Sequence, residues 1–319
     1  MLKVRAKLLS LVVPVFNEQE TIKLFLDRTI PVLERSCALV GADAEYEIVF
    51  VNDGSTDATS VVVETLGQRD PRIKLINLSR NFGKEAAVAA GLNYATGDAI
   101  IPIDVDLQDP PEIIEPMVAK WVGGAKAVEA VRMDRSSDTW FKRVSARGFY
   151  SLYNRVADRP IRENVGDFRL LDREVVDVMR SLGERSRFNK ALYSWVGFAH
   201  ETVTFSREKR SAGTSKWKYW RLWNFALDGI TASTTAPLRI WTYLGAFTAL
   251  AAFAYAAFIL VRTALFGPDT AGYPSIIIVV LLMGGLNMIA LGVMGEYVGR
   301  IAREVRGRPL YVVQSTIGL

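Results

Sequence analysis

The sequence predicts an α/β protein with a doubly wound, mostly parallel sheet, followed by an interfacial helix and two transmembrane helices. Three observations support this prediction. Short β-rich runs alternate with helical stretches, polar turns follow successive runs, and two uncharged apolar segments lie towards the C-terminus. Alternation at this spacing is typical of parallel sheets with right-handed crossovers.

The expected elements follow one another closely in the first part of the chain. The strands are runs rich in Val, Ile and Leu, at residues 8–13, 46–52, 73–78, 98–104 and 125–131, with a further strand at 201–205. The helices are expected at residues 18–40, 57–68, 83–95 and 111–122. Sheets of this kind bind ligands beyond the carboxyl ends of their strands. Polar turns at 14–18, 52–57, 79–85 and 104–109 should therefore meet at one edge.

Composition points to a membrane protein. Half of the 319 residues are hydrophobic, and the net charge is +5. The mean hydropathy of +0.16 is high for a soluble enzyme. The apolar excess lies in residues 240–261 and 276–295, each close to the roughly 20 residues that a helix needs to cross a bilayer. A single cysteine, Cys37, excludes an intramolecular disulfide and fits a reducing compartment.

The charge pattern predicts an orientation and a set of segments. Lys and Arg flank both apolar segments, so both termini and the first domain should be cytoplasmic, in a multi-pass protein of the inner membrane. Basic residues beside the spans point to anionic lipid rather than nucleic acid. The expected segments are a catalytic domain (1–210), an amphipathic juxtamembrane segment (211–239), the two spans (240–261 and 276–295), an external loop (262–275) and a basic tail (296–319).

The juxtamembrane segment mixes basic and aromatic side chains. Between Lys216 and Ile230, a helix would gather its Trp, Tyr and Leu residues on one broad side. Such a helix can lie in the membrane interface, with its aromatic rings at headgroup depth. Packing of this helix on the catalytic domain is the alternative. In either arrangement it could bring a lipid phosphate to the site.

An Asp-x-Asp pair marks the chemistry of the predicted edge. Asp104 and Asp106 directly follow the fourth strand, and "LQDPPE" continues the turn into a helix. Carboxylate oxygens suit Mg²⁺ or Mn²⁺, which fill their other positions with phosphate and water. A metal held in this way can stabilise a leaving diphosphate.

The other polar turns are less specific. The turn from Asp53 to Asp57 could be an ordinary turn and helix cap. The chain has neither a G-x-G-x-x-G after its first strand nor a Walker lysine loop.

Taken in order, the motifs resemble a known family. "PVFNE", "VNDGSTD", "NFGKEAA", "DVDLQDPPE", "GDFRLLDR" and "RSAGTSKW" precede the two apolar segments. This order is similar to the polyprenyl-phosphate glycosyltransferases of glycosyltransferase family 2, relatives of dolichol-phosphate mannose synthase, from about Leu8 to Arg308. The bacterial undecaprenyl-phosphate glucosyltransferases are the most similar branch. The resemblance implies a GT-A fold, inverting transfer from a nucleoside diphosphate sugar to a lipid phosphate, and a homo-oligomer, favoured as a tetramer.

The resemblance also implies roles for individual residues. It makes Asp104 and Asp106 ligands of the metal and the diphosphate, with Gln108 beside them, and it makes Asp167 the proposed base. The residues implied around the nucleotide sugar are Pro14, Phe16, Glu18, Asp53, Lys84 and Gln108. The resemblance makes Arg207, Arg210 and Lys216 part of the basic segment that holds phosphates. Repulsion between donor and acceptor phosphates suggests that Arg132 and Arg135 also bind phosphate, with a solvated loop after a strand as the alternative reading of these two residues.

Two positions depart from the family pattern. Phe16 replaces the more usual tyrosine, which removes a hydroxyl group and keeps a stacking face. Residues 189–191 read Asn-Lys-Ala where the family commonly has Met-Arg-Gly, and the change from Arg to Lys loses a bidentate fork.

The expected reaction charges undecaprenyl phosphate with a hexose, with UDP-glucose as the leading donor. The acceptor is a phosphate monoester that is already charged at neutral pH, so a strong base is hardly needed. Asp167 is therefore expected to orient a basic residue or the acceptor, with proton abstraction as the alternative. N-acetylglucosamine, galactose, mannose or aminoarabinose donors remain open. A lipid-carrier translocase or a membrane scaffold is the non-enzymatic alternative. A processive polysaccharide synthase is disfavoured because Gln-x-x-Arg-Trp is missing.

Overall fold

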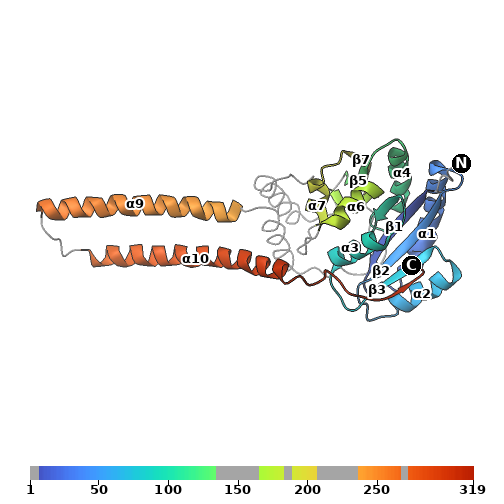
Figure 1. Ribbon diagram of the computed structural model, residues 1–319, viewed down its shortest axis with the longest axis horizontal. Coiled ribbons are helices and arrows are strands. Elements are labelled where there is room, and N and C mark those ends of the chain that lie inside the picture. Colours follow the sequence, from blue (N-terminus) through green and yellow to red (C-terminus); the bar gives the residue numbers. More distant parts are fainter. Residues whose placement is uncertain (1–6, 134–164, 183–188, 207–235, 267–271) are drawn as a thin grey trace. The chain divides into compact units, whose positions relative to one another are not determined.

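The computed structural model describes residues 7–133, 165–182, 189–206, 236–266 and 272–319 (Figure 1). The chain divides into two compact units. The sheet unit contains the N-terminal part of the chain and returns at residues 309–319, whereas the helical unit consists mainly of residues 227–308.

The sheet unit is built on one mixed sheet. Among the described residues the sheet has eight strands, in the order β7-β5-β6-β4-β1-β2-β3-β8. Only β6 and β8 run antiparallel to their neighbours, so the predicted α/β architecture with a mostly parallel sheet is confirmed. The strands are β1 (Leu8–Val15), β2 (Glu45–Asn52), β3 (Ile73–Leu78), β4 (Ala99–Pro102), β5 (Ala127–Arg132), β6 (Val165–Asp172), β7 (His200–Phe205) and β8 (Val313–Ile317).

Helices cover both faces of the sheet, and the side chains of β1 pack alternately against the two layers of helices. Leu11 and Val13 belong to the core formed with α1, α2 and α4, whereas Val12 belongs to the core formed with α3, α6 and α7. A strand buried on both sides needs the continuous apolar run that its sequence shows. The helices of this unit are α1 (Ile22–Val40), α2 (Thr59–Arg69), α3 (Lys84–Tyr94), the 3-10 turn η1 (Pro111–Ile113), α4 (Ile114–Val122), α6 (Arg173–Ser181) and α7 (Asn189–Trp195).

The elements follow the predicted ones closely up to β5, with a later start for α1. This helix begins at Ile22 instead of Glu18 because Asn17 has a left-handed φ of 54° and residues 17–21 form a turn. Two antiparallel strands were not anticipated. β6 includes the "GDF" motif, and β8 lies in residues 296–319, the segment expected to be a tail.

The prediction of two membrane-spanning helices is wrong. Residues 240–261 and 276–295 do form helices, within α9 (Ala236–Phe266) and α10 (Tyr273–Val305), which lie side by side and antiparallel (Figure 1). In the part of the chain that the structure describes, however, no helix combines the length and the apolar character that crossing a bilayer requires. Each run is only part of a longer helix that also carries charged side chains, which are Arg239 and Arg262 in α9 and Glu296, Arg300, Arg303 and Glu304 in α10. The expected interfacial helix, from Lys216 to Ile230, lies outside the described residues.

The last strand ties the end of the chain to the sheet. Val312 accepts a hydrogen bond from the Ser79 amide at 2.9 Å, and Ser315 Oγ accepts one from Asn77 Nδ2 at 3.1 Å. Ile317 packs on the core that contains α1, and Tyr311 packs on the core that contains α3. This strand therefore covers the edge of β3 that would otherwise be open.

Deleting residues 312–319 should destabilise the sheet unit. Loss of the edge pairing and of the partly buried side chains of Val313 and Ile317 is expected to lower the free energy of unfolding by about 2–4 kcal/mol. The matched control, Ser315→Ala, removes one exposed hydrogen bond and should cost about 1 kcal/mol or less. Chemical denaturation of the three proteins measures this. Equal stability of the truncated and full-length chains would show that β8 contributes nothing.

Candidate active site

Four turns meet at the carboxyl ends of β1, β2, β3 and β4. These strands are parallel neighbours, so the turns that follow them lie along one edge of the sheet. The turns comprise residues 16–21, 53–58, 79–83 and 103–110. The edge predicted from the sequence is thus formed, and its turns are bonded to one another.

Asn17 joins the first two turns. Its amide donates to Ser55 Oγ at 2.9 Å, and its Oδ1 accepts from the Thr56 amide at 2.8 Å. The next amide, of Glu18, donates to Thr59 Oγ1 at 2.9 Å. Asn17 therefore fixes the β1 turn against the β2 turn. Pro14, Phe16 and Glu18, which were predicted to bind the nucleotide, are half-buried at the end of β1 and in the turn that follows it.

Asp53 joins the second turn to the third. It is 4% exposed, and its Oδ1 and Oδ2 accept from the amides of Phe82 and Gly83 at 2.7 and 2.9 Å. Burial raises the pKa of Asp53, and the two amide hydrogen bonds partly offset that effect. Both carboxylate oxygens thus bind the backbone directly before Lys84. We call this contact the clamp on the Lys84 loop, which comprises residues 79–83.

A glycine allows the two turns to approach this closely. Gly54 has a φ of +67°, and a Cβ atom there would overlap the backbone of Arg80 and lie 2.5 Å from the Asn81 amide nitrogen. Any side chain at this position would push the turns apart.

Lys84 stands at the centre of the site, between two carboxylates. Its Nζ lies 2.8 Å from Asp104 Oδ2 and 2.9 Å from Asp167 Oδ2. The three side chains come from the start of α3, the end of β4 and β6, and they are 39%, 35% and 21% exposed. The structure thus brings together Asp104 and Asp167, which are 63 positions apart in the sequence.

The electrostatics keep this centre charged. Desolvation acts to lower the pKa of Lys84, but the charges and hydrogen bonds of Asp104 and Asp167 outweigh it, so the pKa lies well above the ordinary lysine value. Lys84 therefore remains an ammonium group at neutral pH. It places one positive charge between the carboxylates of Asp104 and Asp167.

The two aspartates of the Asp-x-Asp turn differ in how far their side chains are exposed to solvent. Asp104 is half-buried, whereas Asp106 is 7% exposed and accepts from the Gln108 amide at 3.1 Å. Leu107 has a φ of 57°, which is unusual for a leucine and makes this turn tight. Within the described residues, no group of three or more His, Cys, Asp or Glu side chains is placed to hold a metal. A metal at this turn would need ligands from a bound molecule.

The expected phosphate-binding residues are only partly described. Arg132 ends β5, and its Nη2 lies 3.4 Å from Asp109 Oδ1. That places it beside the Asp-x-Asp turn. Arg135, Arg207, Arg210 and Lys216 lie outside the described residues.

A buried polar cluster behind Asp167 was not predicted. Arg169, 3% exposed, lies 3.4 Å from Glu129 Oε1 and donates to the Gly166 carbonyl at 2.9 Å. Its guanidinium group covers the ring of Tyr193 at 3.9 Å. The cluster fixes the strand that bears Asp167. Its signal in the sequence is the alternation of "GDFRLLD", which puts Arg169 on the same face as Asp167.

His200 also borders this cluster, with its Nδ1 3.6 Å from Glu129 Oε1. The residue lies at the start of β7.

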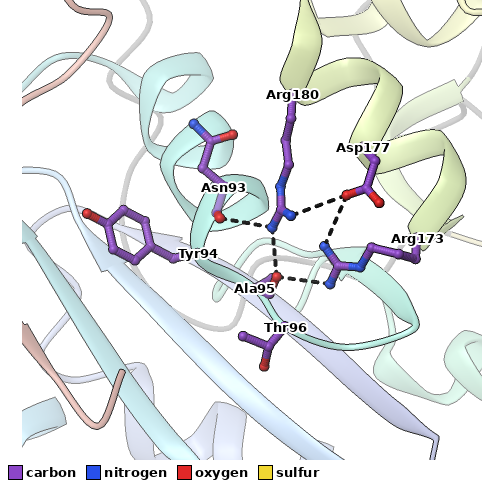
Figure 2. A pocket seen from close by; sticks show the side chains of 7 residues that line it. All are labelled: Asn93, Tyr94, Ala95, Thr96, Arg173, Asp177 and Arg180. Carbon is purple, nitrogen blue, oxygen red and sulfur yellow. Dashed lines mark hydrogen bonds and ion pairs between the residues drawn. The ribbon is translucent and has the colours of Figure 1, made fainter.

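A polar hollow of about 360 Å³ lies at the other end of α3 (Figure 2). Arg180 donates to the carbonyls of Leu92, Asn93 and Ala95, and Arg173 donates to those of Ala95 and Gly97. Both guanidinium groups also pair with Asp177. These groups satisfy carbonyls that the end of a helix leaves unpaired, so the hollow has a structural role.

Comparison with known proteins agrees with the geometry of the edge. The sequence model described as glycosyl transferase family 2 matches residues 10–180. This chain belongs to that family. It is therefore an enzyme that transfers sugars. The residues matched by the family model include the four turns described above.

Near full-length relatives fall within the same family. An uncharacterized glycosyltransferase of Synechocystis sp. is 46% identical, over 98% of this chain and 96% of its own length. The bactoprenol glucosyl transferase of Shigella phage SfX is 48% identical, over 96% of this chain and 99% of its own. A prophage bactoprenol glucosyl transferase homolog of Escherichia coli K12 is 48% identical, over 96% and 98%.

Asp53→Asn tests the clamp on the Lys84 loop. An amide oxygen can accept from one of the two amides, while its NH₂ group faces the other donor. We expect a loss of about 1–3 kcal/mol in the free energy of unfolding, together with weaker donor binding. Denaturation and donor titration measure the two effects. Asp43→Asn, at an exposed turn of the opposite edge, is the matched control and should change neither. Normal stability and donor binding in Asp53→Asn would exclude the clamp.

Proposed function

We propose that the enzyme transfers glucose from UDP-glucose, with inversion, to an undecaprenyl phosphate acceptor. The observation that supports this most is the Lys84–Asp104–Asp167 cluster at the carboxyl edge of the sheet, in a chain 48% identical to bactoprenol glucosyl transferases. The cluster provides the place for a diphosphate, and the near full-length relatives suggest the sugar and the lipid. The acceptor is a membrane lipid, so the reaction takes place where the enzyme meets a membrane surface.

The donor set of the Asp-x-Asp turn fits a hard divalent cation. Asp104 and Asp106 offer carboxylate oxygens two positions apart, with Asp104 partly open to solvent and Gln108 beside them. Mg²⁺ and Mn²⁺ are commonly held by one or two carboxylates, with phosphate and water as further ligands. The two carboxylates of this turn match that pattern. When bound, the metal would neutralise charge on the departing diphosphate.

The nucleotide would lie against the wall made by the first two turns. Pro14, Phe16 and Glu18 form part of this wall, and the ring of Phe16 offers a flat face for stacking. Asp53 acts on the donor through the loop that it holds, since both of its oxygens accept amides of that loop. Binding of the diphosphate then depends on the position that this loop gives to Lys84.

The acceptor needs orientation more than activation. An oxygen of the phosphate monoester attacks the anomeric carbon, the bond from that carbon to the diphosphate breaks, and no proton has to be removed from a dianionic acceptor. Asp167 accepts a hydrogen bond from Lys84 at 2.9 Å, which fixes the position of its carboxylate. We therefore assign Asp167 an orienting role. Lys84 and Arg132 would offset the repulsion between acceptor and donor phosphates.

The donor and the acceptor are tested by one labelling experiment. The purified protein is incubated with undecaprenyl phosphate and, in turn, radiolabelled UDP-glucose, UDP-N-acetylglucosamine, UDP-galactose or GDP-mannose. Label from UDP-glucose should move into the organic phase, and should fail to do so without the lipid. Transfer from another donor alone would refute the assignment of glucose. No transfer from any donor would favour a translocase or a scaffold.

The carboxylates should differ in their effects on the reaction. Asp104→Asn and Asp106→Asn should abolish transfer, because each would remove a proposed metal and diphosphate ligand. Asp167→Asn should leave measurable activity, because an amide can still orient a neighbouring group. Initial rates of lipid labelling measure this, with Asp43→Asn as the control of unchanged rate. Full activity of Asp104→Asn or Asp106→Asn in the presence of metal would refute the metal role.

A further inference from the structure

The ammonium group of Lys84 lies against one of the two proposed metal ligands. Its Nζ is 2.8 Å from Asp104 Oδ2, a distance at which the carboxylate is directly hydrogen-bonded. The same ammonium reaches Asp167 Oδ2 at 2.9 Å. A divalent cation that binds Asp104 would lie close to this positive charge, and the two cations would compete for the same oxygens.

The backbone at Lys84 is fixed, so any change must come from its side chain. Asp53 holds the amides of Phe82 and Gly83, and Gly54 packs against the backbone of Arg80. Lys84 then begins α3, whose next turns are buried. A lysine ammonium on a flexible four-carbon stem can change partners without backbone movement. Its 39% exposure leaves room for such a shift.

We propose that Lys84 is an exchangeable counter-cation of the donor site. It neutralises Asp104 and Asp167 while the site is without donor, and it gives up Asp104 when a divalent cation and a nucleoside diphosphate enter together. The released ammonium keeps its contact with Asp167 and takes an oxygen of the incoming diphosphate as its new partner. This inference rests on the proposed function, because it takes the Asp-x-Asp turn as the metal site.

Two consequences follow from this exchange. The metal binds weakly by itself, because it must displace a cation from Asp104 and gains few ligands in return. The diphosphate removes both obstacles, since it supplies metal ligands and a new partner for Lys84. Metal and nucleotide therefore bind cooperatively, and by linkage each strengthens the binding of the other by the same factor. Much of this coupling is lost when residue 84 carries no charge.

The test is a titration with Mn²⁺, using the electron paramagnetic resonance signal of the free ion as readout. The proteins are the wild-type full chain, Lys84→Met, and Lys120→Met as matched control. Lys120 pairs with Glu201 at 2.7 Å and is 38% exposed, so it resembles Lys84 in pairing and exposure. Without nucleotide, Lys84→Met should bind Mn²⁺ about three- to tenfold more tightly than the wild type, and Lys120→Met should match the wild type.

A second titration, with saturating UDP, measures the coupling. UDP should tighten Mn²⁺ binding in the wild type by a larger factor than in Lys84→Met. Lys84→Gln serves as a second uncharged variant, and near-ultraviolet circular dichroism establishes that each variant is folded. Mn²⁺ affinity that is equal to the wild type or weaker in both folded variants overturns the proposal, as does a failure of every protein to bind the ion.

These titrations contain neither a sugar donor nor a lipid acceptor. Their outcome is therefore independent of whether the proposed transfer reaction takes place. Lipid labelling by the wild type together with unchanged Mn²⁺ affinity in the variants refutes the role of Lys84 alone. Tighter Mn²⁺ binding in the variants without lipid labelling refutes the proposed reaction and retains the exchange of cations.

Discussion

The site depends on the placement of one positive charge between two carboxylates. Lys84 contacts Asp104 and Asp167, which come from distant parts of the chain. Without that charge, acidic side chains gathered at the end of a sheet would repel one another. The arrangement places one positive charge among the acidic side chains of the edge, where the proposed diphosphate would bind.

The rest of the sheet unit holds these three residues in place. Asp53 clamps the loop before Lys84, the tight turn at Leu107 ends the segment that bears Asp104, and Arg169 braces the strand that bears Asp167. Asp53 and Arg169 make buried polar contacts, and the turn at Leu107 is a fixed backbone conformation. Such contacts preorganise a site, so that binding energy is not spent on ordering it. The relatives named as glucosyl transferases match almost the whole chain.

The sequence predicts much of this arrangement because its signals are local. Alternating apolar runs place the strands, and polar turns after them place Asp104 and the loop of Lys84 at one edge. Partners distant in the sequence are not predicted in the same way. Neither the pairing of Asp53 with backbone amides nor the stacking of Arg169 on Tyr193 leaves a local pattern. The return of β8 to the sheet is likewise invisible, because a short exposed run resembles a tail.

A crystal structure of the protein soaked with UDP-glucose and Mn²⁺ would test the central claim most directly. The account predicts Mn²⁺ on Asp104 and Asp106, the donor diphosphate beside it, and Lys84 moved from Asp104 towards a phosphate oxygen while still contacting Asp167. A donor bound elsewhere on the molecule, with Lys84 still bridging both carboxylates, would contradict it.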